Sequence, residues 1–190
     1  MDPMTTQLEP VDAAPSRRAA LGDAVVVAAW TDHHEELYAF LVRTTSDPEV
    51  AADLLSEAFL RLTREVRAER APDNVRAWLY RVAGNLAVSR GRRIAAGLRW
   101  LTRTVAAGRT ADVDDLPETG VLAREGRAEL IGALDDLRPD ARAALLLSSE
   151  GFSGAEIAAA IGRSEAATRT LLCRTRLHVR RRLEPAEAVR

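Results

Sequence analysis

Two helix-start signals around a single glycine, in residues 150–176 (EGFSGAEIAAAIGRSEAATRTLLCRTR), constrain the fold more than any other part of the chain. Ser153, followed three residues later by Glu156, forms a capping box that satisfies free backbone N–H groups at a helix start. Gly162 supplies a turn because glycine reaches positive φ at little cost. Ser164 can then cap a second helix. The spacing predicts two helices joined by about three residues, as in a helix-turn-helix.

The second of these predicted helices has two different faces. The residues that can pack inward are Thr168, Leu171, Leu172 and Val179. From Arg163 to Leu183, both included, there are seven arginines and one acid, Glu165. In a major groove, the first turn of such a helix meets base edges and its later arginines meet phosphates. The pattern therefore favours a DNA-reading helix, with a solvated amphipathic helix as the alternative.

The composition indicates a helical protein. Apolar residues make up 47% of the chain and aromatic residues only 4%, so Ala, Leu and Val must fill the core, and Ala and Leu favour helices over sheets. A single cysteine, Cys173, excludes an internal disulfide and a cysteine-based metal site. The first 20 residues lack the apolar core of a signal peptide, and the apolar run over 24–30 is too short to span a bilayer. We expect a cytoplasmic protein with no membrane insertion.

Helix boundaries are marked in the first half of the chain. A helical pattern over 24–66 is broken at Ser46-Asp47-Pro48, where Asp47 can cap a new helix and Pro48 suits its first position. The polar stretch EVRAERAPDN ends that helix, and Asp73 or Asn74 can cap the next one. On that helix we expect Trp78 to belong to the core.

Charge alternates in blocks along the chain. Residues 76–109 hold eight arginines and no acid, whereas residues 110–136 hold eight acids and two arginines. With Pro117 and Gly120, the second block indicates a flexible acidic linker. We therefore predict an all-α fold of two helical domains joined by that linker. The expected ranges are a disordered tail at 1–23, a domain at 24–108, the linker at 109–126, a domain at 127–184 and a tail at 185–190. The linker either shields a basic surface or is simply solvated.

No motif points to catalysis. His33 and His34 are adjacent and point to different sides of a helix, whereas the zinc-protease pattern places two histidines four residues apart. A glycine-rich phosphate loop, a serine elbow and paired cysteines are all missing from the sequence. We expect no enzyme activity, no catalytic residue, no metal and no cofactor.

Three segments together resemble the extracytoplasmic-function (ECF) sigma factors of the sigma-70 family. ELYAFLVRTTSDPEVAADLLSEAFLRL resembles the start of region 2, and VRAWLYRVAGNLAVSRGRR resembles the following helix, which opens and reads the −10 element. LRPDARAALLLSSEGFSGAEIAAAIGRSEAATRTLLCRTRLHVRRRL resembles region 4, which binds the −35 element. The likeness covers about two thirds of the chain, in the family's order.

The resemblance implies roles for particular residues. Core polymerase, through its beta and beta-prime subunits, would be bound by Asp53, Leu54, Glu57 and Phe59. The −10 DNA would be contacted by Asn74, Arg76, Arg81, Asn85, Arg90, Arg92 and Arg93. The −35 DNA would be contacted by Arg142, Ser164, Glu165, Ala166, Arg169, Thr170, Arg174 and Arg176. The implied partners are core RNA polymerase, promoter DNA and an anti-sigma factor.

Some positions depart from the family pattern. Gly84 and Ser89 stand where arginine and aspartate are more common, and Ala167, Thr168 and Leu171 replace a threonine, a valine and a basic residue. Because glycine costs up to about 1 kcal/mol inside a helix, we expect a looser −10 helix. We expect the altered recognition helix either to bind −35 DNA more weakly or to read an unusual −35 sequence.

Two other functions are compatible with parts of the pattern. One is a helix-turn-helix DNA-binding regulator with an N-terminal sensor domain, although a sensor domain has no need of the basic stretch at 76–109. The other is a sigma-like adaptor that binds polymerase without melting a promoter. The sequence favours a sigma factor that recognises −35 DNA and melts −10 DNA.

Overall fold

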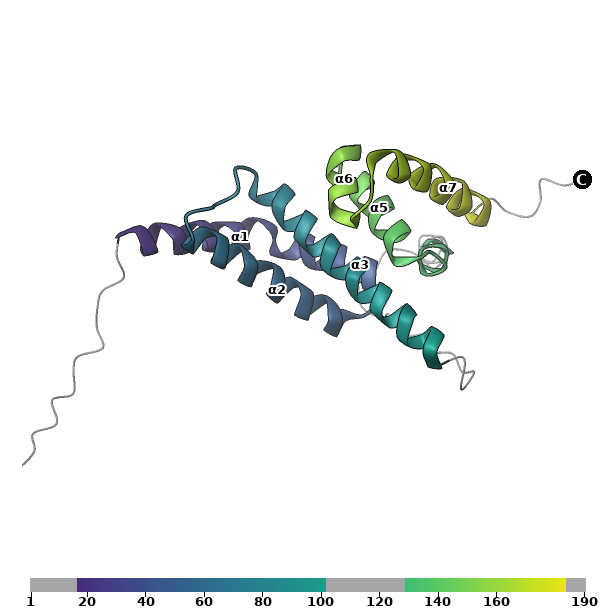
Figure 1. Ribbon diagram of the computed structural model, residues 1–190, viewed down its shortest axis with the longest axis horizontal. Helices are drawn as coiled ribbons and strands as arrows, with labels where there is room; N and C mark the ends of the chain where they lie inside the picture. Colours follow the sequence, from purple (N-terminus) through teal and green to yellow (C-terminus); the bar gives the residue numbers. More distant parts are fainter. Residues whose placement is uncertain (1–16, 102–128, 184–190) are drawn as a thin grey trace, which may run out of the picture.

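The computed structural model describes residues 17–101 and 129–183, and all regular structure within these ranges is helical (Figure 1). The helices are α1 (Arg17–Thr45), α2 (Pro48–Arg67), α3 (Val75–Leu101), α5 (Pro139–Ser149), α6 (Gly154–Ile161) and α7 (Glu165–Leu183). Residues 129–135 are also helical. The predicted all-α class is confirmed. The predicted linker at 109–126 lies outside the described residues, as do 1–16 of the predicted N-terminal tail. Residues 17–23 of that tail are helical, because α1 begins at Arg17.

The helix starts follow the capping signals in the sequence. Asp47 Oδ1 accepts hydrogen bonds from the backbone N–H groups of Glu49 and Val50, both at 3.0 Å, and Pro48 occupies the first position of α2. Asn74 is the residue that caps α3, because its Oδ1 accepts the N–H of Ala77 at 2.9 Å. These side chains satisfy donors that have no partner inside their own helix.

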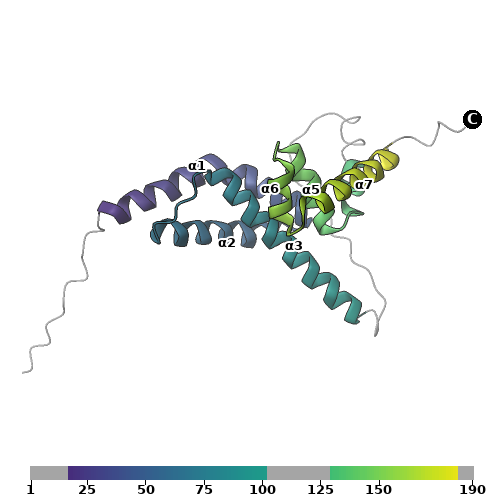
Figure 2. The same ribbon diagram turned by 45° about the horizontal axis from the view of Figure 1, so that its top comes forward.

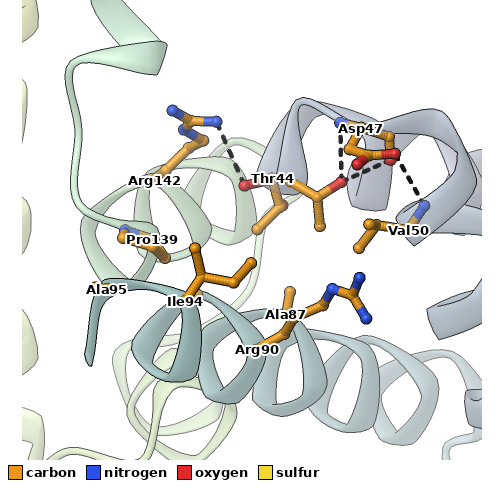
Figure 3. Close-up of a pocket in the computed structure, with 11 residues that line it drawn as sticks. Thr44, Asp47, Val50, Ala87, Arg90, Ile94, Ala95, Pro139 and Arg142 are labelled. Carbon is orange, nitrogen blue, oxygen red and sulfur yellow. Dashed lines mark hydrogen bonds between the residues drawn. The ribbon is translucent and has the colours of Figure 1, made fainter. Parts of the chain in front are cut away.

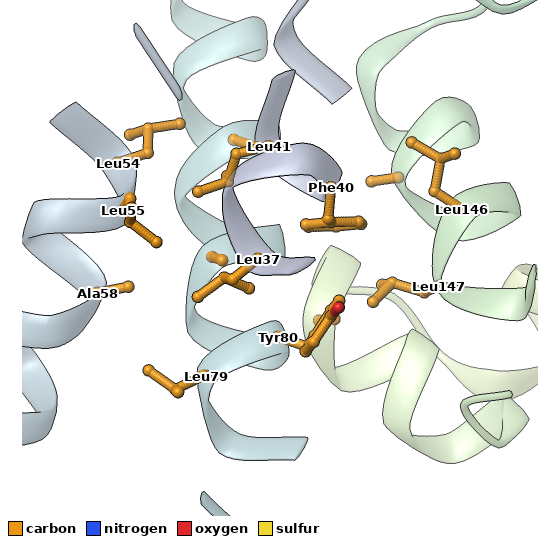
Figure 4. Close-up of a cluster of buried hydrophobic side chains, with 14 of the residues drawn as sticks. Leu37, Phe40, Leu41, Leu54, Leu55, Ala58, Leu79, Tyr80, Leu146 and Leu147 are labelled. Atoms are coloured by element: carbon orange, nitrogen blue, oxygen red, sulfur yellow. The ribbon is translucent and has the colours of Figure 1, made fainter. Parts of the chain in front are cut away.

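Helices α1, α2 and α3 form an N-terminal bundle (Figures 1 and 2). The expected stripe of α1 is its core face, since Leu37, Phe40 and Leu41 are fully buried. They meet α2 residues such as Leu55 and α3 residues such as Leu79 (Figure 4). Among the described helices, none is long and apolar enough to cross a bilayer.

Helices α5, α6 and α7 form a C-terminal bundle that packs directly on the N-terminal bundle. The contacts run from α5 and α6 to α3, and from α5 to α1. Leu147 of α5 lies beside Phe40 and Tyr80 (Figure 4), and Ile157 and Ile161 of α6 belong to the same buried cluster. The two bundles therefore share one continuous hydrophobic core, which the sequence pattern did not predict.

Candidate nucleic-acid interface

The helix-turn-helix has the expected local geometry. Ser153 Oγ accepts the backbone N–H of Glu156 at 3.3 Å, and the Glu156 carboxylate accepts the Ser153 N–H at 2.8 Å, which completes the capping box. Gly162 ends α6 in the left-handed region with φ of 64°. Ser164 Oγ accepts the N–H of Ala167 at 3.3 Å and caps α7. The turn thus fixes the direction in which α7 leaves α6.

One face of α7 is buried and the other is open. Thr168 and Leu172 are buried, and Leu171 and Val179 are partly buried, as predicted. The exposed side chains include most of the predicted −35 contacts: Ser164, Glu165, Ala166, Arg169, Thr170, Arg174 and Arg176. Of these, Arg176 donates to Ser148 Oγ on α5 at 2.6 Å. The first turns of α7 therefore present their side chains to solvent, where a duplex can approach.

A buried carboxylate on α5 accepts a hydrogen bond from the turn of the helix-turn-helix. Asp140, 3% exposed at the start of α5, accepts a hydrogen bond from Arg163 in the turn between α6 and α7. Burial by itself would raise the pKa of Asp140, but the hydrogen bond from Arg163 and the charges of Arg163 and Arg138 outweigh it and hold the pKa below its ordinary value. This hydrogen bond holds the turn between α6 and α7 against α5.

Arg142 lies apart from the other predicted −35 residues. It is 7% exposed, and its Nε donates to the backbone oxygen of Leu134 at 2.8 Å. Its other guanidinium nitrogens reach Ser46 Oγ at 2.6 Å and the Asp135 carboxylate at 3.1 Å. In this conformation Arg142 ties α5 to the α1–α2 turn beside a cavity of about 300 Å³ (Figure 3), so its donors are not available to a phosphate.

The predicted −10 residues divide into three groups. Asn74, Arg81 and Arg93 are exposed on α3 or its cap. Three others donate to the C-terminal bundle: Arg76 to Glu150, Asn85 to Ala159 and Arg92, which is itself exposed, to Ile161. Arg90 is partly buried beside the cavity of Figure 3, and its Nε has no hydrogen-bond partner among the described residues.

A groove separates the start of α3 from the start of α6. Its volume is about 460 Å³. The N-terminal bundle contributes Pro72, Asp73, Asn74, Ala77, Trp78 and Arg81, and α6 contributes Ala155, Glu156 and Ala159. Hydrogen bonds from the hydroxyl and the backbone of Ser153 hold the pKa of Glu156 below its ordinary value, so this wall of the groove is negatively charged at neutral pH. Trp78 packs partly buried against the core, consistent with the core role expected for it.

The predicted polymerase contacts on α2 also divide by exposure. Asp53 is exposed, and Glu57 is partly exposed and accepts a hydrogen bond from Arg61 at 2.7 Å. Leu54 and Phe59 are core residues, 8% and 6% exposed. The acidic pair is therefore available to a basic partner, whereas the apolar pair holds α2 in place.

Two residues that the sequence pattern did not single out lie at these surfaces. Glu150, after α5, accepts hydrogen bonds from Arg43 at 3.2 Å and from Arg76 at 3.3 Å. Trp30 is 43% exposed, stacks on His34 with ring centroids 4.9 Å apart and meets the edge of Phe59. Neither residue belongs to a recognisable motif. Trp30 and His34 lie four residues apart on α1, whereas the packing of the helices brings Trp30 to Phe59 and Glu150 to its two arginines.

Comparison with known proteins gives consistent matches. The family model for Sigma-70 region 2 matches residues 29–97, and that for Sigma-70, region 4 matches residues 127–179. The ECF RNA polymerase sigma factor SigE of Mycolicibacterium smegmatis is 30% identical over 166 residues, which cover 85% of this chain and 64% of the relative. SigJ of Mycobacterium tuberculosis, also an ECF RNA polymerase sigma factor, is 33% identical over 75% of this chain and 46% of its own length. The chain thus spans less than two thirds of these relatives.

A solved structure shares the fold. The sigma factor RpoE, crystallised in complex with the anti-sigma factor NepR from Bartonella quintana, superposes with a TM-score of 0.60. The alignment covers 86% of this chain and 97% of that one, at 18% identity.

Proposed function

The chain belongs to the sigma-70 family, in its extracytoplasmic-function group, and from this premise we propose that it binds core RNA polymerase and directs promoter-specific initiation. In this proposal the N-terminal bundle binds the polymerase and melts and reads the −10 element. The helix-turn-helix reads the −35 element. The protein performs no catalysis itself and acts in the cytoplasm, where the polymerase is.

The observation that carries the proposal is the open face of α7. Its first turn exposes Ser164, Glu165 and Ala166, and its next turns expose Arg169, Thr170 and Arg174. Small and polar side chains can approach base edges, and an arginine paired with a guanine edge contributes about 1–3 kcal/mol of discrimination. The later arginines lie where a DNA backbone would run.

The polymerase-binding surface would include the acidic side chains of α2. Asp53 and Glu57 lie four residues apart, on one face of the helix, and both reach solvent. Such a pair suits a basic surface on the beta-prime or beta subunit. An anti-sigma factor is a further expected partner, as the resemblance to the family implies.

In vitro transcription tests the proposal. Purified core polymerase is incubated with a pool of GC-rich promoter fragments, with and without this protein, and the transcript starts are mapped. A sigma factor should create new starts that share two short elements at a fixed spacing. Replacing both Arg169 and Arg174 with alanine should remove those starts. The matched control is Arg67→Ala, an exposed α2 arginine whose ion-pair partner is Asp23 at 3.5 Å.

Other outcomes would support the other functions. Tight polymerase binding without any new start would favour a sigma-like adaptor. Binding to duplex DNA without polymerase binding would favour a helix-turn-helix regulator.

A further inference from the structure

A cavity of about 300 Å³ lies where the turn between α1 and α2, the second half of α3 and the start of α5 meet (Figure 3). Its apolar lining includes Val50, Ala87 and Ile94, and its charged lining residues are Asp47, Arg90 and Arg142. A cavity of about 150 Å³ is enough to hold benzene. The space therefore admits a single ring or a short aliphatic chain together with one polar group.

Two close contacts give the cavity fixed walls. A Cβ added at Gly91 would lie 2.5 Å from Pro139 Cγ, so α3 and α5 touch there with no side chain of α3 between them. Arg142 forms another wall, and each of its three guanidinium nitrogens already has a partner, namely Leu134, Ser46 and Asp135. Arg142 thus adds positive charge to the cavity but holds its own donors elsewhere.

Arg90 differs from Arg142 because it has no partner. Its Nε is buried, and Arg90 makes no hydrogen bond or ion pair with any described residue. Figure 3 shows its side chain extending from α3 toward the side of the cavity that Asp47 and Val50 form. A buried donor on a charged group is unfavourable until an acceptor satisfies it. The cavity therefore contains a donor that suits an entering acceptor.

The charges around the cavity favour an anion as that acceptor. Asp47 is the one acidic residue among the described residues that line it, against two arginines. Its Oδ1 accepts the backbone N–H groups of Glu49 and Val50, and the positive end of α2 offsets its charge. The guanidinium of Arg90 can pair with a carboxylate through two parallel hydrogen bonds.

We propose that this cavity binds a small monocarboxylate with an apolar body, that is, an aromatic or short aliphatic acid. The carboxylate pairs with Arg90, and the apolar body lies against Val50, Ala87 and Ile94. A bare inorganic anion would leave this apolar lining without contacts, and a neutral molecule would leave the charge of Arg90 unpaired. Arg90 is then a ligand-binding residue rather than the −10 DNA contact expected from the sequence. The site uses neither α7 nor the acidic pair of α2, so it does not depend on the proposed function.

Titration of the full chain with a set of acids tests the proposal. The acids are benzoate, phenylacetate and hexanoate. Benzamide is the neutral counterpart of benzoate, and inorganic phosphate is an anion without an apolar body. Isothermal titration calorimetry at pH 7 and constant salt measures each affinity. At least one acid should bind one site per chain with a Kd below about 1 mM, about tenfold or more tighter than benzamide or phosphate.

Arg90→Gln removes the proposed partner of the carboxylate and keeps a polar side chain. Arg67→Gln is the matched control, because Arg67 is an exposed arginine that does not line the cavity. The acid that binds should lose about tenfold or more of its affinity in Arg90→Gln and none in Arg67→Gln. Urea unfolding supplies a second measurement. Without acid, the two variants should unfold at the wild-type midpoint or above it, and the acid should raise the midpoint of wild type and Arg67→Gln but not of Arg90→Gln.

Four results would overturn the proposal. The first is that no acid of the set binds, and the second is that Arg90→Gln binds as tightly as wild type. The third is that phosphate binds more tightly than the acids, which would make Arg90 a contact for inorganic phosphate groups. The fourth is a lower unfolding midpoint of Arg90→Gln without acid, which would make Arg90 a structural residue.

Discussion

Replacing Tyr80 with phenylalanine should stabilise the protein at neutral pH. Tyr80 is 1% exposed, and its ring lies between Phe40 of α1 and Phe152 of the C-terminal bundle, with centroid distances of 5.2 and 5.0 Å. Its hydroxyl is buried and has no hydrogen-bond partner among the described residues. A buried polar group without a partner costs about 1–3 kcal/mol. Tyr80→Phe removes that group and keeps the ring, so we expect a gain of about that size.

The same hydroxyl makes stability depend on alkaline pH. Burial, reinforced by the negative charge of Glu150, raises the pKa of Tyr80 from 10.0 to about 12. Because the folded-state pKa is the higher one, the unfolded chain ionises first: the ionisation of Tyr80 leaves folding stability unchanged below pH 10 and lowers it as the pH rises from 10 to 12. This pKa difference of two units corresponds to a loss of about 2.7 kcal/mol of folding stability by pH 12.

Urea unfolding at a series of pH values measures both effects. The wild-type protein should lose stability between pH 10 and 12 more steeply than Tyr80→Phe, and the variant should be the more stable one at pH 7. Absorbance at 295 nm should show a tyrosine that ionises near pH 12 in the wild type and is missing from the variant. A variant less stable than wild type at pH 7, with an unchanged alkaline slope, would refute the reasoning.

Three further predictions concern the helix-turn-helix. Gly162→Ala should cost about 1 kcal/mol in urea unfolding, because φ is 64° there and a Cβ is strained in that region. Asp140→Asn should lower stability at pH 7 but not at low pH. The lowered pKa of Asp140 contributes stability that is present above its ordinary pKa of 3.8 and is lost as the pH falls through the folded-state pKa. Unfolding free energies of wild type and variant, measured at several pH values, should therefore converge at the acid end. Arg174→Ala should weaken binding to the mapped −35 duplex and reduce the slope of log affinity against log salt by about 1, as a titration at several salt concentrations would measure.

Local structure was predictable because its signals lie within a few residues of each other. Asp47 with Pro48, and Ser153 with Glu156, mark helix starts that the structure confirms. The sequence left open whether Asp73 or Asn74 caps α3, since both residues can do so and only the geometry of the turn decides.

The contact between the bundles was not predictable, because it joins residues about 70 positions apart. Asn85 and Arg92 carry donors that suit a DNA phosphate and a helix carbonyl equally well, and no local pattern distinguishes the two acceptors. Gly84 stood out as a departure from the family, for which we expected a looser helix. In the structure, the absence of a side chain at Gly84 leaves room for Ala160 of α6. Likewise, the motif around Leu54 and Phe59 does not reveal whether these two apolar side chains face a partner or the core, because both arrangements give the same sequence pattern.

The packing of α6 on α3 joins the two bundles through one hydrophobic core. Loss of either bundle would expose the apolar side chains that the other buries against it, so the two bundles should melt together in a single cooperative transition. The calorimetric enthalpy of unfolding should then equal the van't Hoff enthalpy.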